Sequence, residues 1–239
     1  MKAPDIFNHH KIKPPFVFAL PKGRVMGEAV SLLKKIGIDL PDDFLSNERR
    51  RLITELPFPS ALLNMKKDFS CLQLVEIKNW DVFSFVASSS AVAGILGRDI
   101  WEEKLQSNDV ALDNIYVPLD LKIGQCRLAT ARLKNAPPAS GDKKIVASKY
   151  PNLSRYYYQT KNQAIDVVAL SGSLELAPAM GLCDEMIDLV ATGRTLADNG
   201  LCEGETILDV SSLLVVNRVS YKTYPLAFST FCAAFEKNL

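Results

Sequence analysis

The sequence predicts an α/β fold whose sheets are mostly parallel. Short apolar runs of strand length alternate along the chain with segments in which apolar residues recur every three or four positions, as they do on a helix. Hydrophobic residues make up 48% of the 239 residues, so one large domain or two small ones can bury a core. Alternating strands and helices favour parallel neighbours in a sheet, with helices packed on its faces.

The first half of the chain begins with a polar arm, 1–15, which we expect to be flexible. The elements predicted after it are a strand at 16–20, a helix at 25–36, buried strands at 82–86 and 91–96, and a helix at 99–105. Gly37 is placed to end the first helix. The weakly alternating segment 116–121 is the expected crossover out of a first domain.

The second half shows the same alternation. The elements predicted there are strands at 126–131, 145–148, 166–170 and 186–191, a helix at 152–160, an apolar strand region at 207–219 and a final helix at 225–237. The segment 135–142 is rich in Pro, Ser, Asn and Gly and is expected to be a loop.

The composition excludes several classes of protein. A net charge of +1 argues against nucleic-acid binding as the main activity. The five cysteines are odd in number and form no CxxC motif, which indicates a reducing, cytoplasmic location. The only histidines are His9 and His10, so a Cys/His metal site is not expected. No apolar run reaches transmembrane length, and the N-terminus lacks the pattern of an export signal.

A small-residue loop follows the strand predicted at 186–191. It consists of Ala191, Thr192, Gly193, Arg194 and Thr195. Gly193 permits close approach of the backbone, the threonines offer hydroxyls, and Thr195 is placed to cap the helix that follows. Backbone N–H groups in such a loop can hold a phosphate. An ordinary capped turn is the alternative.

Two carboxylates stand upstream of this loop. Asp188 lies inside the apolar strand, where a charge is costly unless it is paired or exposed. Glu175 follows the turn that contains Gly172 and Ser173. Both carboxylates can accept hydrogen bonds from sugar hydroxyls; a structural Asp188 and a helix-capping Glu175 remain the alternatives.

Two groups of cations complete the candidate site. Lys22, Gly23 and Arg24 follow the first predicted strand, and parallel sheets bind ligands at the carboxyl ends of their strands. Lysine and arginine there suit a pyrophosphate, although a plain surface loop has the same composition. The triplet Arg49–Arg51 is a second candidate for phosphate binding, with a solvated loop as its alternative.

Taken together, the motifs resemble those of one family. They are LPKGR (20–24), DLKIGQCRL (120–128), ASKYPNL (147–153), GSLELAP (172–178), GLCDEMIDLVATGRTLADNGL (181–201) and DVSSLLVVN (209–217). In this order they resemble the ATP phosphoribosyltransferases, the first enzymes of histidine biosynthesis. The resemblance implies transfer of the 5-phosphoribosyl group of 5-phosphoribosyl pyrophosphate (PRPP) to N1 of ATP, with release of pyrophosphate.

The resemblance also implies an architecture. We expect two α/β domains with a cleft between them, similar to class II periplasmic binding proteins. Domain I would comprise 16–118 and 206–239, and domain II, which binds PRPP, 119–205. The length suggests the short form, with no C-terminal regulatory domain. Its relatives work with a regulatory subunit that resembles histidyl-tRNA synthetase, in an expected hetero-octamer built on homodimers of the catalytic chain.

Site residues follow from the same resemblance. Residues assigned to catalysis at the pyrophosphate are Lys22, Arg24 and Arg50. Residues assigned to PRPP are Glu175, Asp188, Ala191, Thr192, Gly193, Arg194 and Thr195. Residues assigned to the nucleotide are Lys22, Gly23, Arg24, Gly94, Gly172 and Ser173. Mg²⁺ is the expected cofactor, held mainly through substrate phosphates and without dedicated protein ligands.

The first domain departs from the family pattern. Val92 replaces the first Asp of Asp-x-Gly-Ile-x-Gly-x-Asp, and Phe83 replaces the Pro of Arg-x-x-Asp-Ile-Pro. The usual Ser-Arg-Lys-Leu is Arg-Arg-Arg-Leu at 49–52. Two alternatives therefore stay open: a catalytically degenerate subunit that acts through interactions, and a cleft-type receptor for a small molecule.

Overall fold

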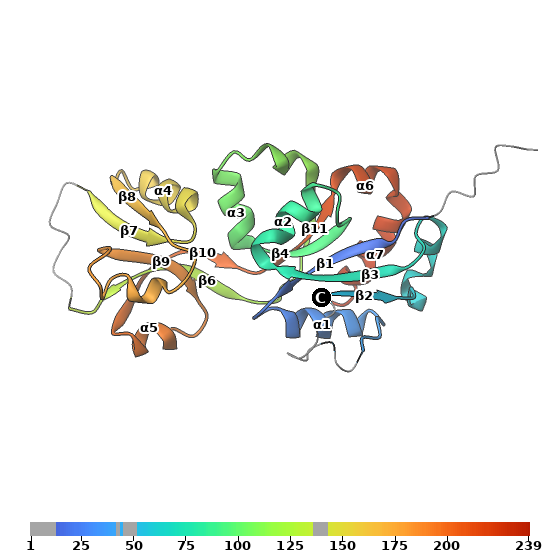
Figure 1. Ribbon diagram of the computed structural model, residues 1–239, viewed down its shortest axis with the longest axis horizontal. Coiled ribbons are helices and arrows are strands. Elements are labelled where there is room, and N and C mark those ends of the chain that lie inside the picture. The colour runs from blue at the N-terminus through green and yellow to red at the C-terminus, as the bar shows by residue number, and fades with distance from the viewer. Residues whose placement is uncertain (1–12, 42–43, 45–51, 136–142) are drawn as a thin grey trace, which may run out of the picture.

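The chain forms two α/β lobes of unequal size in a computed structural model (Figure 1). The structure describes residues 13–41, 44, 52–135 and 143–239. The predicted arm up to residue 12 and the predicted loop from 136 to 142 lie outside these ranges. Within them, no helix combines the length and the apolar character that a membrane crossing requires.

The larger, first lobe contains a six-stranded sheet of order β2-β3-β1-β4-β11-β5. Its strands are β1 (Phe16–Lys22), β2 (Ile53–Leu56), β3 (Leu72–Lys78), β4 (Ala93–Gly97), β5 (Ile115–Asp120) and β11 (Ser212–Asn217). β1 runs parallel to β3 and β4, whereas β2, β5 and β11 run antiparallel to their neighbours.

Helices cover both faces of this sheet. One face carries α1 (Met26–Lys35), the 3₁₀ segment η2 (Ser60–Lys67) and α7 (Pro225–Glu236); the other carries α2 (Asn79–Ala87), α3 (Arg98–Gln106) and η3 (Val110–Asn114). The short α6 (Arg218–Thr223) follows β11. Strand periodicity divides β1 between these faces, since Phe16 and Phe18 pack toward α7 and Ala19 packs toward α2.

The second lobe contains a five-stranded sheet of order β10-β6-β9-β7-β8. Its strands are β6 (Cys126–Leu133), β7 (Lys144–Ser148), β8 (Ile165–Ala169), β9 (Glu185–Val190) and β10 (Leu201–Val210). α4 (Pro151–Thr160) packs on one face, and η4 (Leu174–Leu176) with α5 (Arg194–Asp198) packs on the other. β7 is parallel to β8 and β9, whereas β6 is antiparallel to β9 and β10.

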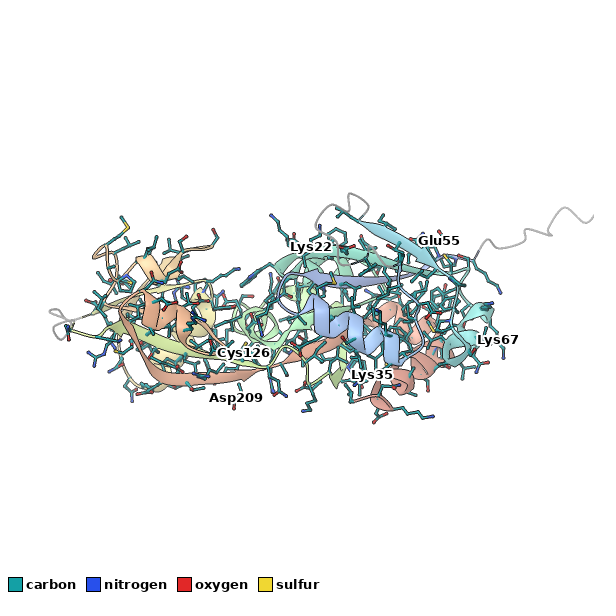
Figure 2. The ribbon with its side chains drawn as sticks, turned by 90° about the horizontal axis from the view of Figure 1, so that it is seen from below. Lys22, Lys35, Glu55, Lys67, Cys126 and Asp209 are labelled. Atoms are coloured by element: carbon teal, nitrogen blue, oxygen red, sulfur yellow. The ribbon has the colours of Figure 1, made fainter. Side chains whose placement is uncertain are left out.

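The chain passes between the lobes twice, at 121–125 and at Ser211, and we call these two segments the interlobe connection. Figure 2 shows Cys126 and Asp209 at this junction. The two segments are joined by hydrogen bonds from Leu121 N to Ser212 O (2.8 Å) and from Ser212 N to Ile123 O (2.9 Å). β10 stays paired with β6 as far as Val210, so the second sheet extends past the predicted boundary at residue 205.

Two expectations from the sequence are wrong. Both sheets are mixed rather than mostly parallel, because β2 and β11 in the first sheet and β6 in the second run opposite to the other strands of their sheet. The segment 82–86 is part of α2 and not a strand. Its buried residues Val82, Phe83 and Val86 have helical spacing, which the β-branched and aromatic composition obscured.

The strand region predicted at 207–219 is divided between β10 and β11, which belong to different sheets. The remaining predicted strands and helices are confirmed to within a few residues. Gly37 follows the C-cap residue of the first helix, Ile36, and has φ of 91°, as predicted for a helix stop. The predicted crossover at 116–121 is mainly strand β5, and the passage to the second lobe follows it. β2 and β3 were not predicted from the sequence.

Candidate functional site

A cavity of about 770 Å³ opens between the lobes. The first lobe contributes Lys78, Trp80 and Glu103, and the second contributes Ser148, Lys149, Pro151, Ala169, Leu170 and Ser171. A smaller cavity of about 160 Å³ lies against the interlobe connection and contains Arg24. The two lobes therefore enclose a cleft that is lined by cations and hydroxyls, with an aromatic ring in its wall.

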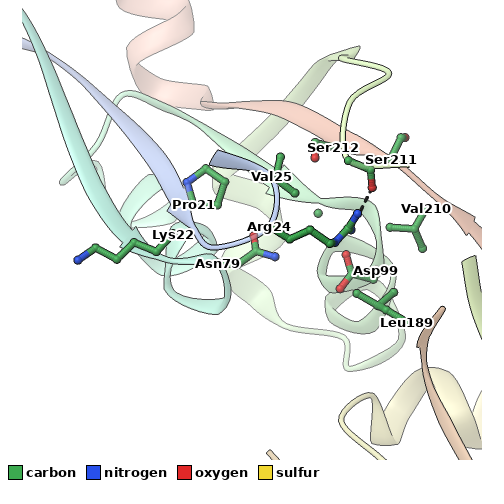
Figure 3. A pocket seen from close by; sticks show the side chains of 12 residues that line it. Pro21, Lys22, Arg24, Val25, Asn79, Asp99, Leu189, Val210, Ser211 and Ser212 are labelled. Carbon is green, nitrogen blue, oxygen red and sulfur yellow. Dashed lines mark hydrogen bonds between the residues drawn. The ribbon is translucent and has the colours of Figure 1, made fainter. Parts of the chain in front are cut away.

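Arg24 lines the smaller cavity, and its side chain points toward the interlobe connection (Figure 3). Its Nη2 donates to the carbonyl oxygen of Gly124 at 3.0 Å and lies 3.2 Å from Sγ of Cys126. Gly23, with φ of 103°, lets the chain turn between β1 and α1 so that Arg24 reaches this position. Asp99, only 2% exposed, lines the same cavity.

Lys22 is exposed at the carboxyl end of β1. Its side chain points away from Arg24 in Figure 3. Because β1 and β3 are parallel, Lys22 lies in register with Lys78 at the end of the neighbouring strand. Lys78 lines the larger cavity, so the carboxyl ends of β1 and β3 supply two cations. Of these, the sequence pointed to Lys22 alone.

Asp188 lies on β9, part-buried, and its Oδ1 accepts the backbone N–H of Leu189 at 2.8 Å. Burial raises the pKa of its carboxyl group; the Leu189 N–H and the charge of Lys149 act in the opposite sense, and Glu175 and Asp99 raise the pKa further. These electrostatic effects place Asp188, Glu175, Lys149 and Asp99 in one neighbourhood. η4, which contains Glu175, contacts β9, which contains Asp188, so the two carboxylates predicted to act together come from adjoining elements.

The 191–195 loop follows β9 and is held by a neighbouring strand. Arg127 donates from Nη1 to the carbonyl oxygen of Ala191 at 3.3 Å, and its Nη2 pairs with Glu203 at 2.6 Å. Gly193 has φ of 76°, a conformation that favours glycine. The hydroxyl of Thr192 accepts the backbone N–H of Arg194 at 3.4 Å.

Most of this loop is open to solvent: Ala191, Thr192, Arg194 and Thr195 are exposed. The prediction that Thr195 caps the next helix is wrong. α5 already begins at Arg194, with Gly193 at the cap position, because the left-handed turn occurs at the glycine. The hydroxyl of Thr195 is therefore not used as a cap.

Other predicted residues have different surroundings. Gly172 and Ser173 are exposed and follow Ser171, which lines the larger cavity. Gly94 is buried in β4, where a Cβ would come within 2.9 Å of Val82 Cγ1 and 3.1 Å of Ala19 Cβ. The structure thus gives Gly94 a packing role, and its assignment to the nucleotide stays a prediction. Arg50 lies outside the described residues.

Several residues that line the site were missed by the sequence analysis. Lys149 stood within a recognised motif, but its cleft position depends on contacts between the lobes. Its Nζ lies over the Trp80 ring, 5.3 Å from the centroid. Asn79 lines the Arg24 cavity, and its buried Oδ1 has no hydrogen-bond partner within the described ranges. An unpaired buried acceptor is costly and marks a place for a ligand donor.

Comparison with known proteins gives a consistent result. The family model HisG, ATP phosphoribosyltransferase, matches residues 78–237. An ATP phosphoribosyltransferase of Novosphingobium aromaticivorans is 39% identical over 226 residues, covering 93% of this chain and 94% of the relative. One from Bacillus velezensis is 39% identical over 204 residues, covering 85% of this chain and 86% of the relative.

Solved structures show the same likeness. A chain of the ATP phosphoribosyl transferase (HisG:HisZ) complex from Thermotoga maritima superposes with a TM-score of 0.71 at 25% identity, covering 93% of this chain and 98% of that one. A Candida albicans protein with the periplasmic binding protein fold superposes with a TM-score of 0.60 at 10% identity, covering 94% of this chain and 70% of that one. The two-lobe fold expected from the sequence is confirmed.

Proposed function

Because this chain belongs to the ATP phosphoribosyltransferase family, we propose that the cleft between its lobes is the place where PRPP and ATP meet. The enzyme transfers the 5-phosphoribosyl group of PRPP to N1 of ATP and releases pyrophosphate, the first step of histidine biosynthesis. One observation carries the assignment of the cleft: Arg24 of the first lobe lines the smaller cavity, while Lys149 of the second lobe lines the larger one and acts on the charge of Asp188.

We propose that the second lobe, 126–210, binds PRPP. Its 191–195 loop would hold the 5-phosphate through backbone N–H groups and the hydroxyls of Thr192 and Thr195. Arg127 supports this role because it fixes the loop at the Ala191 carbonyl while Glu203 occupies its other donors. Asp188 and Glu175 would accept hydrogen bonds from the ribose hydroxyls; their elements β9 and η4 contact each other.

The first lobe supplies charge for the leaving group. N1 of adenine carries a free lone pair at neutral pH, so the reaction needs no strong base to begin. The demanding step is cleavage of the anomeric C–O bond, during which pyrophosphate leaves and positive charge builds on the ribose. Lys22, Arg24 and Arg50 would stabilise the pyrophosphate, and carboxylates near the ribose would stabilise the cationic ring.

The nucleotide would contact the first lobe and the wall of the larger cavity. Gly23 leaves open space beside Lys22 and Arg24, since a Cβ there would meet no atom within 4 Å. Gly172 and Ser173 extend the wall formed by Ser171. We add Lys78, Asn79 and Lys149 to these candidates on the basis of the two cavities.

We propose Mg²⁺ as the divalent cofactor of the reaction. Among the described residues no group of three or more His, Cys, Asp or Glu could hold a metal ion alone. Phosphate oxygens of PRPP and ATP are ligands that Mg²⁺ prefers, so the cleft fits an ion that arrives with its substrates. When bound, Mg²⁺ would supply neutralisation of phosphate charge, and Lys22 and Arg24 would bind and orient the pyrophosphate.

We further propose a partner and a location. The HisG:HisZ complex of the Thermotoga maritima relative supports a regulatory subunit, which we expect to resemble histidyl-tRNA synthetase. A homodimer of this chain within a hetero-octamer, and a cytoplasmic location, remain predictions. Co-purification with the partner and the mass of the complex would test the assembly.

The decisive test is release of pyrophosphate from purified protein with ATP, PRPP and Mg²⁺. Each component is left out in turn, without and with the regulatory subunit. Release that requires all three supports the proposal, and histidine sensitivity only with the partner supports the short form. No release under either condition while PRPP still binds would indicate a degenerate subunit, and a failure to bind PRPP would remove the role of the 191–195 loop.

A further inference from the structure

The amino-terminal end of α4, in the second lobe, is held by α3 of the first lobe. Glu103 of α3 is 4% exposed. Its Oε1 accepts the backbone N–H of Asn152 at 3.0 Å and the side-chain Nδ2 of Asn152 at 2.8 Å, and its Oε2 accepts the backbone N–H of Leu153 at 2.8 Å. The two backbone N–H groups belong to the first turn of α4, where N–H groups have no acceptor within their own helix.

The same face of α3 also binds Tyr150, the residue directly before α4. Asp99 lies four residues before Glu103 and therefore on the same face of α3. The hydroxyl of Tyr150 donates to Asp99 Oδ2 at 2.6 Å, and the Tyr150 ring packs on Trp80 of the first lobe with centroids 5.5 Å apart. We call these interactions of Asp99 and Glu103 with residues 150–153 the α3–α4 contact.

A helix start normally receives its capping acceptor from nearby in the sequence. α4 instead receives it from a residue 50 positions away in the other lobe. Tyr150 occupies the N-cap position of α4, but its side chain makes no capping hydrogen bond. The negative charge of Glu103 at the positive end of the helix dipole adds to the hydrogen bonds. Opening the lobes at this point would break these hydrogen bonds and expose the donors and the Glu103 carboxylate to water, which gives up the stabilisation of the buried contact.

The segment held in this way carries a cleft residue. Lys149 directly precedes Tyr150, lines the larger cavity and acts on the charge of Asp188. The position of Lys149 relative to Arg24 therefore depends on how α4 sits against α3. Resting on the function proposed above, we infer that Glu103 and Asp99 are positioning residues that set the geometry between the PRPP-binding lobe and the leaving-group cations.

This role makes a specific demand on kinetics. The residues proposed to bind PRPP, namely Glu175, Asp188 and the 191–195 loop, all belong to the second lobe. Loss of the α3–α4 contact should leave their arrangement intact, whereas bond cleavage needs Arg24 from the first lobe. We expect Glu103→Gln to lower kcat about tenfold or more while the Kd of PRPP changes less than about twofold, because misplacement of reacting groups lowers turnover.

A spectroscopic readout follows the contact without turnover. The chain has two tryptophans, so Trp101→Phe leaves Trp80 as the single reporter beside Tyr150 and Lys149. In this background Glu103→Gln should shift the emission of Trp80. Glu102→Gln is the matched control, because Glu102 pairs with Arg98 on its own helix at 3.6 Å. Tyr150→Phe, which removes only the hydroxyl bound to Asp99, provides a second variant should Glu103→Gln fail to fold.

The outcomes separate this inference from the proposed function. Lower kcat, retained PRPP affinity and a shifted emission in Glu103→Gln but not in Glu102→Gln would support it. Wild-type kcat or unshifted emission in both Glu103→Gln and Tyr150→Phe would overturn it, as would loss of PRPP affinity in step with kcat and melting temperature. If wild-type protein releases no pyrophosphate, the proposed function fails, and the emission of Trp80 still reports on the contact.

Discussion

Arg24 of the first lobe donates a hydrogen bond from Nη2 to the carbonyl oxygen of Gly124, 3.0 Å away in the interlobe connection. Gly124 has φ of 64°, and a Cβ there would come within 2.7 Å of Val25 Cγ2, so a side chain would disturb the residue next to Arg24. The candidate catalytic arginine is thus attached to the segment that joins the lobes. Any motion of that segment relative to β1 would change where the guanidinium points.

Replacement of Arg24 by alanine is expected to lower kcat about 10²-fold or more, because a cation that meets charge built up in the transition state is lost. Arg24→Lys keeps the charge but loses the planar set of donors, so we expect an intermediate kcat. Pyrophosphate release at saturating ATP and PRPP measures both variants. Arg132→Ala, at the far end of β6, is the control; an unchanged kcat in Arg24→Ala would remove Arg24 from this role.

Gly94→Ala tests whether Gly94 contacts the nucleotide or serves packing. The added methyl group would meet Val82 Cγ1 at 2.9 Å and the Ala19 carbonyl oxygen at 3.2 Å, between α2 and β1. We expect the variant to lose about 1–3 kcal/mol of unfolding free energy, measured by urea denaturation. The KM for ATP should change little in the fraction that folds. A raised KM for ATP at unchanged stability would support the assignment of Gly94 to the nucleotide.

The order of strands and helices was predictable because each element buries a periodic apolar face. The direction of the strands was not, since periodicity of two is the same in parallel and antiparallel neighbours. The prediction of mostly parallel sheets therefore missed β2, β11 and β6, which run opposite to the other strands of their sheets. In α2, an apolar run with aromatic and β-branched residues concealed helical spacing.

The site was predictable where polar residues interrupt apolar runs. Asp188 and Gly193 are local signals of this kind, and the structure confirms their positions in a strand and in the turn before a helix, while their roles stay predictions. Trp80, Lys149 and Glu103 gave no such signal. Their roles arise from contacts between lobes, such as the one that joins Glu103 to residues 50 positions later, and no short window of sequence contains both partners.

Thr195→Val is expected to weaken PRPP binding roughly tenfold, because the exposed hydroxyl is lost as a donor to a charged phosphate. The helix α5 should persist, since its cap position is Gly193 and not Thr195. Isothermal titration with PRPP measures the affinity. Thr223→Val, on exposed α6 in the first lobe, is the control, and equal affinities in the two variants would mean that the loop is only structural.

Asp188→Asn should make the protein more stable at neutral pH while weakening PRPP binding. Burial raises the pKa of the Asp188 carboxyl group above its value in the unfolded chain. The folded state therefore binds the proton of Asp188 more tightly than the unfolded chain does. This difference stabilises the fold fully below the unfolded pKa, and the stabilisation is lost as pH rises through the folded pKa. Asparagine removes this penalty because it never ionises.

Thermal melts of the wild type and of Asp188→Asn across the acid-to-neutral range measure this effect. The variant's advantage in melting temperature should grow as pH rises from below the unfolded pKa to neutrality, and should then level off. Asp166→Asn is the control, because Asp166 is exposed on β8 and pairs only loosely, at 3.5 Å, with Lys143. A constant difference across the range would mean that Asp188 is not the source of the pH dependence. Such a result would also weaken its assignment to the ribose, since a buried carboxylate kept at a cost to stability is what a binding role explains.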